Sequence, residues 1–141
     1  MGKINVGRLI LGGVVAGIVG DILDYLVDGL WLNKMWSAQL GVWGMAPFSM
    51  RQILWFEFFG IIIGLCAIWV YAGIRPRFGP GVKTAIYAGF VVWMLSTLLP
   101  NFALFWVPHF FSGHLVGYSS LGGLVEILIG TIAGAALYKE D

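Results

Sequence analysis

The sequence predicts an all-α fold, a bundle of four transmembrane helices, and two features of the chain support this prediction. Hydrophobic residues make up 60% of its 141 positions and charged residues 11%, and the mean hydropathy is +0.91. A soluble domain of this length has too little interior to bury so much apolar surface. The chain also contains four segments that reach the roughly 20 apolar residues needed to cross a hydrocarbon core about 30 Å thick.

The four predicted helices belong to a single integral membrane domain covering residues 1–141. Their approximate ranges are 8–32, 52–73, 83–107 and 116–138. The stretch 33–51, between the first two, is too polar and too often broken by Pro and Gly to span a membrane. Within it, apolar residues recur at helical spacing, which favours a short interfacial helix over 34–43. These residues are Met35, Trp36, Leu40 and Trp43.

Basic residues concentrate on one side of the predicted bundle. If the N-terminus faces the cytoplasm, that side also receives the run 74–83, whose Pro, Gly and basic residues predict a tight turn. Arg75, Arg77 and Lys83 in this turn are expected to contact lipid phosphates. The cytoplasmic side then holds Lys3, Arg8, Arg75, Arg77, Lys83 and Lys139, and the opposite side holds Lys34 and Arg51. The positive-inside rule therefore predicts a multi-pass protein with both termini in the cytoplasm.

The first predicted helix carries three acids on one face. At about 100° per residue, Asp21, Asp24 and Asp28 fall within an arc of roughly 60°, and glycines lie beside them. The opposite face is apolar. The acidic face is therefore expected to pack inside the bundle, and the apolar face to meet lipid.

Five of the seven acidic residues lie in predicted spans, and we call these five the acidic cluster: Asp21, Asp24, Asp28, Glu57 and Glu126. Each would cost about 2.5–3.5 kcal/mol at the centre of a lipid-facing helix, so all are expected to point into the bundle. The predicted spans offer no basic residue to pair with them. The cluster is interpreted either as a proton relay or cation site, or as hydrogen-bonding groups that fix helix packing or meet a partner subunit.

Two further features are weaker signals. His109 and His114, in the last link, are five positions apart, one more than a helical i, i+4 metal pair. With Asp28 or Glu57 they could hold a metal ion, and the alternative is that they are interfacial polar residues. Pro100 is expected to kink the third helix and to free a backbone carbonyl there.

The second and fourth predicted helices share a pattern, which leaves open a fold of two similar helical hairpins. The residues that match in the two helices are Glu57, Gly60, Gly64 and Tyr71, and Glu126, Gly130, Gly134 and Tyr138. The spacing from Glu to the first Gly differs by one residue.

The turn has a particular sequence, Ile-Arg-Pro-Arg-Phe-Gly-Pro-Gly at positions 74–81, preceded by Tyr71 and followed by Lys83-Thr84-Ala85. With the glycine-rich acidic first helix and the Glu-bearing last helix, it resembles a family of small four-helix bacterial integral membrane proteins of unknown function. The resemblance implies the four-helix topology and a place in the bacterial cytoplasmic (inner) membrane. It implies no activity.

Two functions are retained from these observations. The preferred one is an accessory or scaffold subunit of a membrane complex, or a self-associating bundle, as short loops and glycine and aromatic contact surfaces indicate. The alternative is a small proton- or cation-coupled transporter or channel that uses the acidic cluster. An enzyme is disfavoured because the sequence shows no catalytic motif.

The expected partners are the lipid bilayer and either a partner subunit or a second copy of the chain. Nucleic acid is not expected, because the net charge of +1 comes with scattered basic residues instead of a basic patch. The sequence identifies no cofactor.

Overall fold

The computed structural model describes residues 3–107 and 109–140. In chain order its α-helices and π-helical segments (η) are α1 (Val6–Asp24), η1 (Tyr25–Trp31), α2 (Asn33–Val42), α3 (Met50–Phe78), α4 (Val82–Trp93), η2 (Met94–Leu98), α5 (Leu99–Trp106) and α6 (Gly113–Leu137). Because η1 continues α1, and η2 and α5 continue α4, four helices are long and apolar enough to cross a membrane. They are Val6–Trp31, Met50–Phe78, Val82–Trp106 and Gly113–Leu137. The predicted all-α, four-helix architecture is confirmed.

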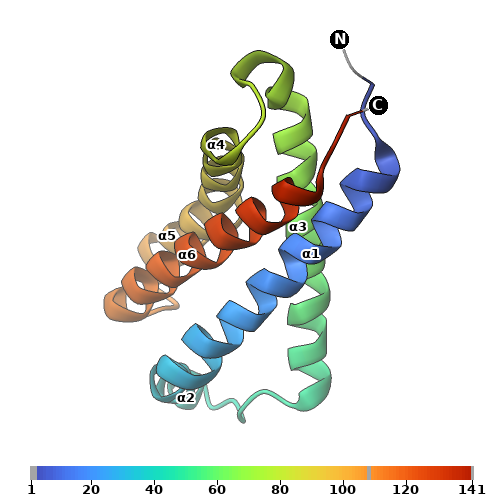
Figure 1. Cartoon of the computed structure of the whole chain (residues 1–141). Helices are drawn as coiled ribbons and strands as arrows, with labels where there is room; N and C mark the ends of the chain where they lie inside the picture. The colour runs from blue at the N-terminus through green and yellow to red at the C-terminus, as the bar shows by residue number, and fades with distance from the viewer. Residues whose placement is uncertain (1–2, 108, 141) are drawn as a thin grey trace.

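Helix α1 lies between α3 and α6 and contacts both through glycines (Figure 1). A Cβ atom at Gly13 would lie 2.7 Å from Cα of Leu65 in α3. A Cβ atom at Gly130 in α6 would lie 2.5 Å from the carbonyl oxygen of Ala16. Ordinary contact begins near 3.4 Å, so only glycine lets these backbones approach so closely. The small residues of the first helix therefore lie on its inner face, as predicted.

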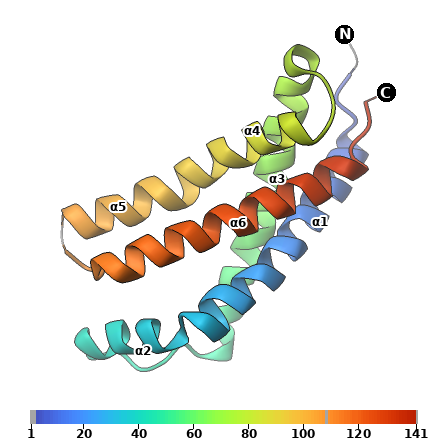
Figure 2. The same ribbon diagram turned by 60° about the vertical axis from the view of Figure 1, so that its left-hand side comes forward.

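Helix α3 follows the rest of the bundle over only part of its length. It packs on α4 near its C-terminal end, and Figures 1 and 2 show its N-terminal half running away from α5. Except for Glu57, the side chains of residues 50–59 are exposed. The main cluster of buried apolar side chains lies in the half of the bundle that holds both termini. Its members are Ala16, Ile68, Tyr71, Ala72, Ala85, Ala88, Ala135 and Tyr138.

The turn between α3 and α4 is shorter than predicted. Helix α3 includes Arg75 and Arg77 and ends at Phe78, so only residues 79–81 form the turn. The expected turn over 74–83 is wrong because Pro76, close to the helix end, removes only one backbone hydrogen bond and does not stop the last turn.

Two side chains hold this short turn in place. The backbone N–H of Gly81 donates to the hydroxyl of Tyr71 at 3.1 Å, and Oγ1 of Thr84 donates to the carbonyl of Gly79 at 2.6 Å. Gly79 and Gly81 have φ angles of 82° and 118°, values that residues with a Cβ atom rarely adopt. The particular sequence of this region therefore has a structural explanation in the turn itself.

The predicted interfacial helix over 34–43 is present as α2, which lies near the end of the bundle opposite the termini (Figure 2). Gln39 ties it to the link between α5 and α6. Its Nε2 donates to the carbonyl of Phe110 at 2.8 Å, and its Oε1 accepts from the N–H of Ser112 at 3.0 Å. Trp43 adds ring contact with Phe111, with centroids 5.4 Å apart.

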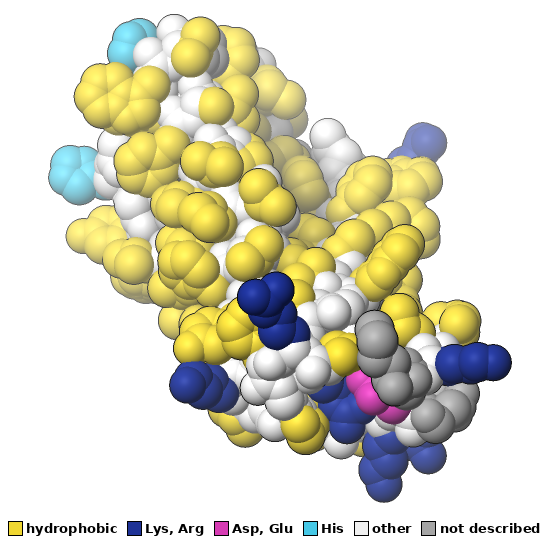
Figure 3. Space-filling model, turned by 90° about the horizontal axis from the view of Figure 1, so that it is seen from above, with side chains coloured by type: hydrophobic (Ala, Val, Ile, Leu, Met, Phe, Trp, Pro, Cys, Tyr) yellow, Lys and Arg dark blue, Asp and Glu magenta, His cyan; other side chains and the backbone are white. Residues whose placement is uncertain are grey.

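The two ends of the bundle differ in charge. Figure 3 views the end that holds both termini, where most of the Lys and Arg side chains in view gather, while the histidines stand toward the other end. The turn between α3 and α4 lies at this end together with the start of α1 (Figure 1), and the helix ends that flank the turn carry Arg75, Arg77 and Lys83.

Candidate functional site

All five residues of the acidic cluster line one pocket of about 380 Å³. The first membrane-length helix supplies Asp21, Asp24 and Asp28, α3 supplies Glu57, and α6 supplies Glu126. The pocket lies mostly beyond the main buried cluster, away from the termini, and the buried side chains of Leu32, Leu115 and Val116 lie further toward the opposite end. The structure thus brings to one place carboxyl groups that lie on three helices.

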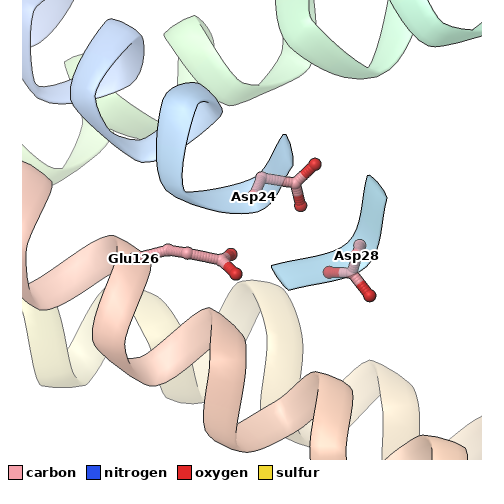
Figure 4. Close-up of side chains that lie close together, drawn as sticks. All are labelled: Asp24, Asp28 and Glu126. Carbon is pink, nitrogen blue, oxygen red and sulfur yellow. The ribbon is translucent and has the colours of Figure 1, made fainter. Parts of the chain in front are cut away.

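The tightest group in the pocket is Asp24, Asp28 and Glu126, which we call the carboxylate triad. One carboxylate oxygen of each lies within 4.8 Å of those of the other two. Figure 4 shows the Glu126 side chain extending from α6 toward the two aspartates of the first helix. Like charges at such separations repel strongly where water is scarce. The triad therefore needs protons or a cation between its oxygens.

Glu126 is the one acid that is fully buried in the described chain, with 7% of its surface exposed. Its Oε1 atom is enclosed and has no hydrogen-bond partner among the described residues. Leaving a buried polar group unpaired costs about 1–3 kcal/mol, and more when it is charged. An orphaned oxygen of this kind marks a place where a ligand or water would be bound.

Both π-helical segments contribute to the pocket. Asp28 lies in η1, and Ser96 and Thr97 lie in η2. Such segments are rare and often occur at functional sites. Regular α-helix was expected at both places, because hydropathy does not distinguish a π-helical turn from an α-helical one.

The interfacial helix α2 reaches the same pocket through one side chain. Nε1 of Trp36 donates to Oδ1 of Asp28 at 2.6 Å, and Trp36 also lines the pocket. A hydrogen bond to a carboxylate is stronger than a neutral one. Trp36 therefore orients one member of the carboxylate triad.

A glycine makes room for Asp21 against α3. A Cβ atom at Gly60 would overlap with Oδ1 of Asp21. Glu57, nearly one turn earlier on α3, lines the pocket and is half-buried. The expected sharing of one face by acids and small residues thus has a steric reason at this position.

Neutral hydroxyl and amide side chains complete the lining, and they were not predicted as a group. They are Ser96, Thr97, Asn101, Ser119 and Thr131. Nδ2 of Asn101 donates to the hydroxyl oxygens of Ser119 and Ser120, each at 3.2 Å, which joins α5 to α6. The sequence feature that could have predicted this polar group is Asn101, because an amide side chain within an apolar helix requires a hydrogen-bond partner on a neighbouring helix.

The pocket is open beside the N-terminal half of α3. Phe56 and Phe59 line it and yet remain 56% and 54% exposed. Ser96, which also lines it, is exposed. These residues belong to the helices that diverge in Figures 1 and 2. The polar interior is therefore accessible from the flank of the bundle.

No Lys or Arg is among the described residues that line the pocket. The ion pair found within residues 3–107 and 109–140 joins Nη1 of Arg75 to Oε1 of Glu140 at 3.2 Å, at the end that holds the termini. The acidic cluster thus has no basic side chain to neutralise it within the described pocket.

The histidines do not join the acids. His114 had been predicted to lie in the link. Because α6 begins at Gly113, it lies in the first turn of that helix instead. His109 and His114 are both exposed, and neither belongs to a described group of three potential metal ligands. The geometry therefore lends no support to a metal site formed by these histidines with Asp28 or Glu57.

Pro100 follows η2 at the start of α5. Proline cannot donate to the carbonyl four residues earlier, which belongs to Ser96. The π-helical segment η2 directly precedes Pro100 and contributes to the pocket, while the predicted kink stays a prediction.

Comparison with protein family models, with curated proteins and with solved structures gave no match to this chain. The resemblance to small four-helix bacterial membrane proteins therefore stays a prediction.

Proposed function

We propose that this protein binds a proton or cation within the membrane and moves it across as a small transporter or channel. The observation that carries the proposal is the buried, unpartnered Oε1 of Glu126 in a pocket lined by four further acids and, among the described residues, no base. In a bilayer such an arrangement is costly. A bound cation or proton offsets that cost.

The same pocket favours transport over a purely structural role for the acids. Carboxyl groups that only fix helix packing would bond to neighbouring helices across a filled interior. Here they surround a space of about 380 Å³ that opens on one flank. Intramembrane acids that face the interior of a helix bundle commonly mark ion pathways.

The direction of access follows from the basic residues. If the end with both termini is cytoplasmic, as the positive-inside rule indicates, the buried core closes the bundle on that side and the pocket lies in the outer half. Transport then requires the core end to open, as alternating-access proteins do by moving one helix group against another. From the family resemblance we infer that the membrane is the bacterial cytoplasmic membrane.

Flux measurements in proteoliposomes test this proposal. The purified chain would be reconstituted with an internal pH-sensitive dye, and gradients of protons, Na⁺, K⁺ or Ca²⁺ would be imposed. Flux above that of protein-free vesicles is expected, with most of it lost in Asp24→Asn and in Glu126→Gln. Glu140→Gln is the matched control, because Glu140 is an acid outside the pocket and should keep full flux.

Two results would contradict transport. One is the absence of flux for every ion tested. The other is equal flux in the wild type and in both pocket variants, provided that circular dichroism and size-exclusion chromatography show these variants to be folded.

A second candidate is the accessory subunit or self-associating bundle, and a specific observation favours it. The N-terminal half of α3 carries exposed Leu54, Trp55, Phe56, Phe58 and Phe59 and stands away from α5. A partner helix could fill this flank and close the pocket. Native mass spectrometry after extraction in mild detergent tests the subunit role, because that role requires a stoichiometric larger partner. A homo-oligomer fits both transport and a self-associating bundle, and the flux measurement then decides between these two.

A further inference from the structure

We propose that the carboxylate triad of Asp24, Asp28 and Glu126 is a binding site for one Ca²⁺-like divalent cation. This inference deepens the proposed function by naming the chemical class of the ion. It rests on three observations: the distances among the triad oxygens, the unpaired oxygen of Glu126, and the neutral oxygen-bearing side chains around them.

The distances fit a single ion. Calcium binds oxygen at about 2.3–2.6 Å, so two ligands on opposite sides of it lie roughly 4.6–5.2 Å apart. The triad oxygens lie within 4.8 Å of one another, a span that one calcium ion can bridge. Magnesium demands near-ideal octahedral geometry at about 2.0–2.1 Å and usually keeps several of its waters, so a set of protein carboxylates seldom holds it alone. The flexible coordination of calcium therefore suits three carboxylates from two helices better.

The donor set fits the same class of ion. All three ligands are carboxylates, which are hard oxygen donors that suit calcium, magnesium and manganese and not the softer transition metals. Asn101, Thr97 and Ser119 line the same pocket and offer neutral oxygens, as calcium sites with six to eight ligands commonly include. The pocket has room for water as further ligand.

An independent sign that a ligand belongs here is the Oε1 atom of Glu126. It is buried, it has no partner among the described residues, and its side chain points toward the two aspartates (Figure 4). Asp28, by contrast, is already oriented by Trp36 through the bond at 2.6 Å, and still has a second oxygen to offer. Side chains from α6 and from the first helix therefore already point to the place where one ion would bind.

Isothermal titration of the purified full chain in detergent with Ca²⁺, and separately with Mg²⁺, tests the site. One Ca²⁺ per chain is expected, with weaker binding of Mg²⁺. Loss of a group that only supports a metal ligand lowers metal affinity by about tenfold or more. Loss of a direct ligand should lower the affinity for Ca²⁺ by at least as much. Asp24→Asn and Glu126→Gln come from different helices, so one remains informative if the other does not fold. Glu140→Gln is the matched control and should bind as the wild type does.

A luminescence measurement places the ion. Tb³⁺ substitutes for Ca²⁺ and emits when a nearby tryptophan is excited, and Trp36 touches Asp28. Emission is expected to fall in Trp36→Phe, and to be displaced by added Ca²⁺. Emission that persists in Trp36→Phe, Asp24→Asn and Glu126→Gln would show that the probe binds elsewhere.

The proposal is overturned if no Ca²⁺ binds, or if binding is unchanged in both triad variants. Its failure can be told apart from failure of the proposed function. Proton flux that depends on Asp24 and Glu126 without Ca²⁺ binding would leave transport in place and remove the metal site. Stoichiometric Ca²⁺ binding without any ion flux would leave the site in place as a static one and remove transport.

Discussion

Substituting Gly130 with alanine tests the glycine contact between α1 and α6 that supports the pocket. The added Cβ would lie 2.5 Å from the carbonyl oxygen of Ala16, whereas ordinary contact begins near 3.4 Å. The two helices would therefore have to separate by about 0.9 Å at this point. The backbone carbonyl of Ala16 cannot rotate away as the end of a long side chain can, so the whole crossing must shift.

The cost follows from the effects of overpacking. Inserting a methyl group into a tightly packed contact costs typically about 1–3 kcal/mol. Replacing glycine by alanine within a helix also contributes a gain of up to about 1 kcal/mol. Gly117→Ala on the same helix is the control. It has the same gain in helix propensity but no steric cost, because a Cβ atom at Gly117 meets nothing within 4 Å. The propensity gain cancels in the comparison, so Gly130→Ala should be less stable than Gly117→Ala by about 1–3 kcal/mol.

The measurement is reversible unfolding by SDS in mixed micelles, followed by circular dichroism, for both variants and the wild type. Equal free energies of unfolding for the two variants would refute the steric explanation.

A second measurement links the packing at Gly130 to the carboxylate triad. Gly130 lies one turn beyond Glu126, so separation of the helices should also draw Glu126 away from the two aspartates and weaken Ca²⁺ binding in Gly130→Ala but not in Gly117→Ala.

Two further predictions concern the ends of the bundle. Gln39→Ala removes both hydrogen bonds between α2 and the link after α5. Amide hydrogen exchange over residues 33–42 should therefore accelerate, while exchange in the core of α1 stays slow. Unchanged exchange in α2 would show that the ring contacts alone hold α2 in place. Tyr71→Phe removes the acceptor for the N–H of Gly81 and should cost about 0.5–1.5 kcal/mol in the same SDS assay. Tyr87→Phe, an exposed tyrosine, is the control, and an equal loss in both variants would argue against the turn contact.

Much of the architecture could be predicted because it depends on local composition. The four spanning helices and α2 were expected within a few residues of where they lie, since length and hydropathy govern them. The acids were expected to face inward, and all five line the pocket. The turn at 74–83 was misjudged because Pro76 falls so close to the end of α3 that it removes only one backbone hydrogen bond. The contacts of Tyr71 and Thr84 with Gly81 and Gly79, which hold the turn at 79–81, are tertiary and not visible in local composition.

The pocket itself could not be predicted from a single sequence. The grouping of Asp24 and Asp28 with Glu126 needs a close crossing of two helices distant in the chain. The divergence of α3 from α5, which opens the flank, leaves no mark in local hydropathy. The π-helical segments are likewise not visible in the pattern, although they carry Asp28, Ser96 and Thr97.

Four apolar helices with acids on their inner faces follow from the amino-acid sequence alone, because an apolar run must meet lipid and a carboxyl group must avoid it. Which acids share a site depends instead on how the helices pack. That choice depends on how closely backbones approach at Gly13, Gly60 and Gly130. Such approach is a property of two surfaces packed together, which neither segment carries alone.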